Sequence, residues 1–297
     1  MARARSAFVG GEAEHATPSP TIVMIRRTRT RARISVRVDS LCHVRIKVIA
    51  DVHGDLETVL SEARACDVLL LLGDLINVID YENAGGILGE VYGSEAVRTW
   101  SDLRAAGKLE ESRAVLAAAS AGREHEMRGL FFTKIDEHSK AFCEQIPSNV
   151  IVTFGNVDVP DMIRKYLPDD VRFVDGEVIE LAGVRFGFIG GGLPKVGIPG
   201  EVPLDVYAEK VAALGPVDVL CAHVPPAIED LAYDVVADTL EPGSEALLAY
   251  LQEHEPKAMY YGHVHQPRLG ETKIGPTHVV NVGSYYRSTG KAWEHEL

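Results

Sequence analysis

The feature that most constrains the fold of this sequence is an apolar run that stops abruptly at a Gly, Asp, Asn or His and recurs five times. The first run, 44–50, is separated from the second, 67–72, by apolar residues at helical spacing over 55–65. Two strands joined by a helix predict a βαβ unit and a parallel sheet. Because the carboxyl ends of parallel strands meet at one edge, we expect the five stops to lie close together. The stops are Asp51-Val52-His53, Gly73-Asp74, Gly155-Asn156, His223 and His263-Val264-His265.

Most of the remaining chain continues this alternation of short strands and helices. The exception is the interval 82–146, which is rich in Ala, Leu, Glu and Arg beyond about residue 94 and has no proline until Pro147. Its composition predicts two or three helices, including 109–119 and 123–145. We therefore predict an α/β domain at 41–297 that carries a helical insertion at 82–146. Further strands are expected at 149–154, 171–174, 177–181, 184–189, 217–222, 258–261, 268–273 and 277–282, and further helices at 160–167 and 243–253.

The net charge of -13 is unevenly distributed along the 297 residues. Residues 1–38 hold eight arginines against two glutamates, whereas the rest holds 22 basic and 41 acidic side chains. The first forty residues lack an apolar signal-peptide core, and we expect 1–40 to be an Arg-rich, disordered tail. The acidic body disfavours long nucleic acid as a partner and attracts divalent cations.

The hydropathy and the spacing of the cysteines indicate in which cellular compartment the protein is found. No apolar run reaches 18 residues, which argues against a membrane-spanning helix. The four cysteines are widely spaced and form no CxxC pair, a pattern typical of reduced thiols. We therefore expect a cytoplasmic protein without disulfides or a thiolate zinc site.

The residues at the strand ends have the chemistry of metal ligands. Alternate residues of an extended chain point the same way, so Asp51 and His53 can share one ion. Imidazole nitrogens mixed with oxygen donors suit two divalent ions of the Mn²⁺, Fe²⁺ or Zn²⁺ type. A carboxylate shared between them, that of Asp74, could hold the ions ~3.5–4 Å apart, as in two-metal hydrolases. Two such ions, two carboxylates and one hydroxide leave a net charge of about +1, which favours a phosphate anion.

The ordered motifs D-x-H, G-D, G-N-x-D, H and G-H-x-H resemble those of the calcineurin-like metallophosphoesterase family, over roughly residues 44–285 without the insertion. The resemblance implies a four-layer αββα sandwich with two metals at the edge of its sheets. It also implies phosphoester hydrolysis by a hydroxide that bridges the metals, with Asp74, Asn156 and His223 as catalytic residues. By matching position, the first metal would take Asp51, His53 and His265, Asp74 would bridge, and the second would take Asn156, His223 and His263.

One position departs from the family pattern in a way that bears on the substrate. Many members have a histidine after Gly-Asn that protonates the leaving group or binds phosphate, and here the residue is Val157. Valine cannot transfer a proton. The rate enhancement from general acid catalysis, typically ~10²–10⁴-fold, must therefore come from another group or be absent. The replacement resembles the branch of small phosphodiesterases. Residues Asn281-Val282-Gly283-Ser284 likewise resemble the Asn-Pro-Gly-Ser turn of that branch.

Several alternatives remain open from the sequence alone. Each stop could be an ordinary turn, with Asp55 a simple N-cap, although all five in order argue against coincidence. The same site could serve a phosphomonoesterase or nucleotidase, or a metal-binding scaffold without activity. The expected partner is a small phosphate ester, nucleotides included, and the insertion could support a homo-oligomer or bind another protein. Four acidic residues after His223 are expected to form a solvated face: Glu229, Asp230, Asp234 and Asp238.

Overall fold

The computed structural model describes residues 44–80, 83–195 and 197–295. The predicted Arg-rich tail at 1–40 lies outside these residues. Within them, two larger sheets and one two-stranded ribbon are present. The first sheet has the order β13 (Trp293–His295), β1 (Ile46–Ile49), β2 (Val68–Leu71), β3 (Val150–Val152) and β4 (Arg172–Phe173).

The second sheet is built from later parts of the chain. Its order is β11 (Glu271–Ile274), β12 (Thr277–Asn281), β10 (Ala258–Tyr261), β7 (Val219–Ala222), β6 (Val184–Ile189) and β5 (Glu177–Leu181). Parallel pairing joins β1 to β4 in the first sheet, and β6, β7, β10 and β12 in the second. The separate ribbon pairs β8 (Tyr233–Asp234) with β9 (Thr239–Leu240).

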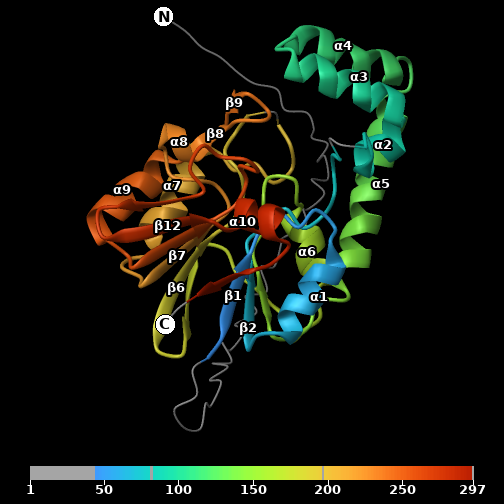
Figure 1. Ribbon diagram of the computed structural model, residues 1–297. Helices are drawn as coiled ribbons and strands as arrows, with labels where there is room; N and C mark the ends of the chain where they lie inside the picture. The colour runs from blue at the N-terminus through green and yellow to red at the C-terminus, as the bar shows by residue number, and fades with distance from the viewer. Residues whose placement is uncertain (1–43, 81–82, 196, 296–297) are drawn as a thin grey trace, which may run out of the picture. The chain divides into compact units, whose positions relative to one another are not determined.

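Three hydrophobic cores separate four layers. The apolar run that contains β2 contributes to two of these cores. Leu69 and Leu71 belong to one core, whereas Leu70 and Leu72 belong to the next. Both faces of this sheet are therefore buried, which explains its continuous apolar sequence. The predicted αββα sandwich is confirmed, and Figure 1 shows helices on both sides of the paired sheets. The first sheet is covered by α1 (Leu56–Arg64), α5 (Glu124–Cys143) and α6 (Pro160–Tyr166), and the second by α7 (Leu204–Ala213) and α9 (Glu245–His254).

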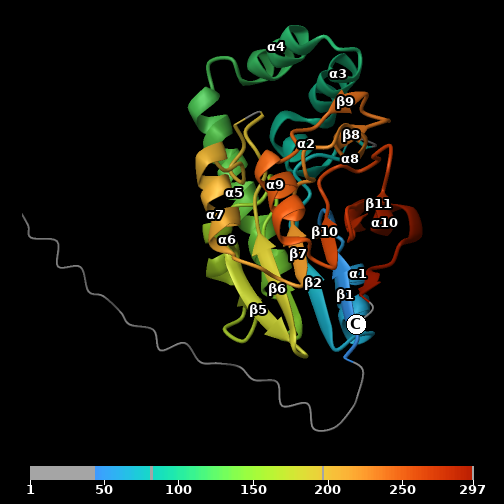
Figure 2. The same cartoon turned by 90° about the vertical axis from the view of Figure 1, so that its left-hand side faces the viewer.

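The interval 82–146 forms four helices in its described part, more than the two or three predicted. In Figures 1 and 2 the α3–α4 pair lies beyond one end of the sheets. None of the helices in the described ranges is both long and apolar enough to cross a membrane. The four helices are α2 (Gly86–Tyr92), α3 (Ser94–Ala105), α4 (Leu109–Ser120) and α5.

Residues 281–284, which are predicted to resemble a turn, instead begin a helix. Asn281 is the N-cap of a helix, α10 (Val282–Thr289), and its side-chain oxygen accepts a hydrogen bond from the Ser284 N–H at 2.8 Å. An asparagine at this position satisfies a free N–H group of the first helical turn. The prediction also lacks α7, α8 (Glu229–Ala232), the β8–β9 ribbon and β13.

Candidate metal centre

Four of the predicted ligands meet in one cluster at the carboxyl ends of the strands. One donor atom from each of Asp51, His53, Asp74 and His265 lies within 4.8 Å of every other. Asp51 and His53 follow β1, and Asp74 follows the adjacent parallel strand β2. Backbone hydrogen bonds hold the two loops side by side, from Asp51 N–H to the Gly73 carbonyl and from His53 N–H to the Asp74 carbonyl. Parallel pairing thus brings the first two stops together, as predicted.

The other three predicted ligands form a second group beside the first. The side-chain oxygen of Asn156 lies 2.9 Å from His223 Nε2 and 2.8 Å from His263 Nδ1. His223 Nε2 is also 3.4 Å from Asp74 Oδ1. Asp74 therefore lies between the two groups, the place that a bridging ligand would need.

The donor geometry is compatible with a bound metal ion. His53 Nε2 and His265 Nε2 face each other at 3.0 Å. Two nitrogens bound to one tetrahedral ion at the usual bond length would be about 3.3 Å apart. The opposing nitrogens, together with Asp51 and Asp74, are the donor set that borderline divalent ions bind.

The backbone at this edge is held in conformations that side chains rarely adopt. The φ angles of Asp51, His53, Asp74 and His263 are 56°, 43°, 52° and 69°. Each non-glycine residue in the left-handed region costs of order 1–3 kcal/mol, and such residues persist only where the surrounding structure fixes them. Four of the eight non-glycine residues with positive φ in the described ranges gather at this edge, where the surrounding structure fixes them.

Two glycines leave the space that the acidic ligands occupy. A Cβ at Gly155 would overlap the Asp74 carboxylate and approach His223 Cε1 to 2.6 Å. A Cβ at Gly283, in the first turn of α10, would overlap the Asp51 carboxylate. The sequence therefore needs glycine at both positions because only a bare backbone can approach the carboxylates this closely.

Burial sets the direction of the pKa shift for every titratable ligand except His263, whose pKa is raised because the Glu241 carboxylate outweighs the effect of burial. It lowers the pKa of His223 to about 3, and it also lowers the pKa of His53 and of His265. These imidazoles are therefore neutral at neutral pH, as metal coordination requires. Burial also raises the pKa of Asp51 and that of Asp74, because loss of water penalises the ionised carboxylates. A cation bound between these two carboxylates would offset that penalty.

Two buried polar residues hold the ligand loops in place. Asp158, the last residue of the G-N-x-D motif, accepts hydrogen bonds from Leu75 N–H at 2.9 Å and Gly155 N–H at 2.8 Å. It thereby joins the loops that follow β2 and β3. Asn281 donates from Nδ2 to the Val264 carbonyl at 2.8 Å, between the two histidines of the last motif. The motif patterns contain both residues, but the prediction from sequence assigns a role to neither.

A third residue near the site was missed entirely. Glu241 Oε2 lies 3.4 Å from His263 Nε2, and Glu241 Oε1 lies 2.6 Å from Lys195 Nζ. Burial opposes ionisation of Glu241, but His263 and Lys195 beside it lower its pKa to about 2. Both Glu241 and Lys195 lie in irregular loops with no motif around them.

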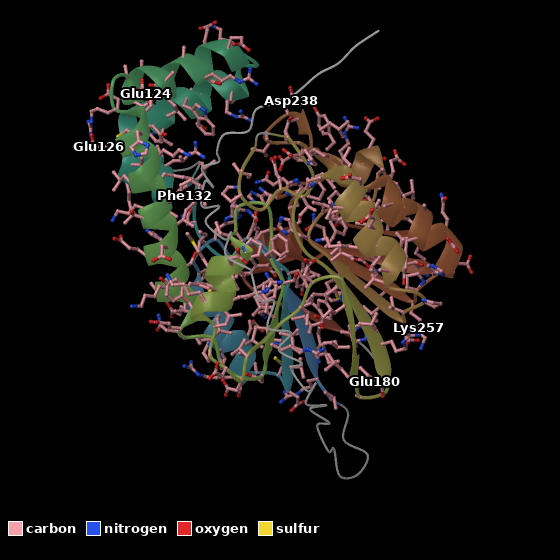
Figure 3. All side chains as sticks on the ribbon, turned by 180° about the vertical axis from the view of Figure 1, so that it is seen from behind. Glu124, Glu126, Phe132, Glu180, Asp238 and Lys257 are labelled. Carbon is pink, nitrogen blue, oxygen red and sulfur yellow. The ribbon has the colours of Figure 1, made fainter. Side chains whose placement is uncertain are left out.

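Figure 3 helps to locate this edge of the molecule. Asp238, which is labelled there, lies between β8 and β9, and Lys257 directly precedes β10 at the opposite end of the strands.

The acidic loop after His223 is not uniformly solvated, contrary to the prediction. Asp234 is buried and accepts backbone hydrogen bonds from Val236, Ala237 and Gln266. A short carboxylate that caps several N–H groups stabilises a turn. Its contact with Gln266 connects the β8–β9 hairpin to the chain just after His265.

Comparison with known proteins agrees with this geometry. Residues 44–267 match the calcineurin-like phosphoesterase family. The chain belongs to this family, whose members hydrolyse phosphoesters. No curated protein matches the sequence significantly.

Solved structures resemble the chain at low sequence identity. One crystal structure shares 17% identity with a TM-score of 0.50 and covers 85% of this chain and 98% of that chain. The protein TT1561 of Thermus thermophilus shares 17% identity with a TM-score of 0.41, covering 81% and 90% of the two chains. A conserved uncharacterized protein of Streptococcus pneumoniae TIGR4, a predicted phosphoesterase, shares 14% identity with a TM-score of 0.28, covering 82% and 75%. The first of these supports the fold.

Proposed function

We propose that this protein is a phosphodiesterase that uses two divalent metal ions. The observation that carries the proposal is the convergence of seven donor side chains, from five strand ends, in two adjacent groups that share Asp74. Ions of the Mn²⁺, Fe²⁺ or Zn²⁺ type bound there would lower the pKa of the attacking water and neutralise charge on the phosphate. Asp51, His53 and His265 would hold one ion, and Asn156, His223 and His263 the other.

The preference for diesters over monoesters rests on Val157. Its side chain is only partly buried and packs against the core beneath the first sheet. Its backbone N–H donates to Asp74 Oδ1 at 3.1 Å, so the residue supports the bridging carboxylate through the main chain. It offers no proton and no positive charge to a leaving group. A monoester dianion depends more on such groups than a diester monoanion does.

A cation beside the first ligand group could contact the phosphate. Arg287, in the last turn of α10, is exposed and makes no ion pair with any residue that the structure describes. The helix that carries it is fixed to the site, because Tyr286 donates a hydrogen bond to Asp55 at 2.5 Å and Gly283 lies against Asp51. Burial is the main reason that the pKa values of His53 and His265 are low, and the charge of Arg287 lowers both further. We assign it to binding of a nonbridging phosphate oxygen.

The test compares two aryl esters. Metal-stripped protein receives Mn²⁺ and is assayed with bis(4-nitrophenyl) phosphate and with 4-nitrophenyl phosphate, beside His263→Ala. His125→Ala, at an exposed position of α5, is the matched control. We expect turnover of the diester that requires both Mn²⁺ and His263 and exceeds turnover of the monoester. Faster turnover of the monoester would make the protein a phosphomonoesterase, and no turnover despite metal binding would favour a scaffold.

A further inference from the structure

The two ring nitrogens of His263 have different neighbours. Nδ1 faces the second ligand group, 2.8 Å from the side-chain oxygen of Asn156. Nε2 points away from that group, toward a carboxylate oxygen of Glu241 at 3.4 Å. A neutral imidazole carries its proton on only one nitrogen, so the partner of Nε2 decides whether Nδ1 has a free lone pair.

Glu241 is itself held in place by Lys195. The ammonium nitrogen lies 2.6 Å from the second carboxylate oxygen, and the side chains of Lys195 and Glu241 are 29% and 18% exposed. An ion pair this short and this shielded from water is stronger than an ordinary surface pair. The two residues come from separate loops, after β6 and after β9, so their contact also joins two segments at the edge of the site.

The other buried imidazole of the same group shows the same arrangement with a different partner. His223 directs Nε2 at Asn156 and Nδ1 at the Leu72 carbonyl, at 3.0 Å. A backbone carbonyl accepts the proton there, and no substitution can remove it. At His263 the corresponding acceptor is a side chain, so its contribution can be tested directly.

We propose that Glu241 is a positioning residue that holds His263 with Nε2 protonated and Nδ1 free to bind the second ion, and that Lys195 keeps Glu241 in this place. The inference rests on the proposed function only in treating His263 as a ligand. A carboxylate behind a ligating histidine fixes the orientation of the ring and its tautomer, and its loss typically lowers metal affinity ~10–100-fold.

The ion pair with Lys195 also explains why the negative charge of Glu241 is compatible with a phosphate-binding site. An unpaired Glu241 would cancel the small positive charge that remains on two ions with their ligands. The ammonium of Lys195 offsets it, so Glu241 can orient His263 without repelling the substrate.

The experiment is a calorimetric titration of metal-stripped protein with Mn²⁺ alone. It compares the wild type with Glu241→Ala, Glu241→Gln and Lys195→Ala. Glu245→Gln, an exposed position at the start of α9, is the matched control. We expect Glu241→Ala to weaken only the second ion, by about 10–100-fold. Glu241→Gln can still accept from Nε2 and should recover most of the affinity, and Lys195→Ala should cause a smaller loss at the same ion.

Two results would overturn the proposal. In one, Glu241→Ala binds both ions as the wild type does. In the other, Glu241→Gln is as weak as Glu241→Ala while Lys195→Ala binds both ions as the wild type does, which would show that the charge of Glu241 acts on the ion and not through the orientation of His263. Because no substrate is present, the titration is independent of turnover: a protein that binds two ions and depends on Glu241, yet cleaves no diester, would refute the phosphodiesterase and leave the role of Glu241 intact.

Discussion

The loops at the metal edge and the α3–α4 pair of the insertion are built in opposite ways. The edge loops have strained backbone angles and buried charges, yet each begins at a strand that packs in the three cores. In α4 the described side chains include no buried apolar residue, and its main neighbours are the other helices of the insertion. The stabilising contacts of this molecule are therefore concentrated at the edge loops, where several backbone angles are unfavourable.

The largest expected effect comes from removing the shared carboxylate. Asp74→Asn keeps the side-chain shape but loses the charge that both ligand groups share, worth several kcal/mol, so diester turnover should fall by about 10³-fold or more. The assay is kcat/KM with bis(4-nitrophenyl) phosphate and saturating Mn²⁺. Asp169→Asn, at an exposed position outside the site, should behave as the wild type. Equal activity of the two variants would refute a bridging role for Asp74.

The second prediction concerns the close approach of the backbone to the ligands. Gly155→Ala places a methyl group against Asp74 and His223, which cannot move without breaking their own contacts. We expect a loss of about 3 kcal/mol or more in the free energy of unfolding, together with weaker Mn²⁺ binding. Urea unfolding and calorimetry measure the two effects. A variant with normal stability would show that the edge is more adaptable than its geometry indicates.

The third prediction separates the two regions by their response to metal. Mn²⁺ that binds only the folded protein should stabilise it by about 2.7 kcal/mol at a concentration 100-fold above Kd. In hydrogen exchange the added protection should appear in the loops after β1, β2 and β3 and not in α4. Helix α4 should exchange fastest with or without metal, because none of its described apolar side chains is buried. Equal added protection in α4 would contradict this separation.

The smallest predicted effect has the opposite sign. Gly129, an exposed position within α5, has open space around its Cα and an ordinary φ. Gly129→Ala should therefore stabilise the protein by about 0.5–1 kcal/mol, by removing the entropic cost of glycine in a helix. Thermal unfolding and the diester assay test it, and a fall in turnover would show that the insertion contributes to the site.

The strand ends could be predicted because their signal is local. A buried strand is apolar, and its apolar run ends at the first polar residue. Asp51, Asp74 and His223 can therefore be recognised from the few apolar residues that precede them. Glu241 and Lys195 could not be found in this way, because neither follows a strand of the main sheets directly and their contact spans two irregular loops. Helix α10 was missed because Val282-Gly283-Ser284 lacks strong helix-forming residues, and its start depends on the Asn281 cap.

The division of the ligands between the two sheets has a consequence for biosynthesis. Asp51, His53, Asp74 and Asn156 leave the ribosome first, whereas His223, His263 and His265 belong to the second sheet and come last. His53 and His265, whose Nε2 atoms lie 3.0 Å apart, are 212 positions apart in the chain. The entropy lost in closing so long a loop makes such contacts slow to form. Neither of the two proposed ion sites is complete until the second sheet has docked, so the metal binding that we propose would require the chain through His265.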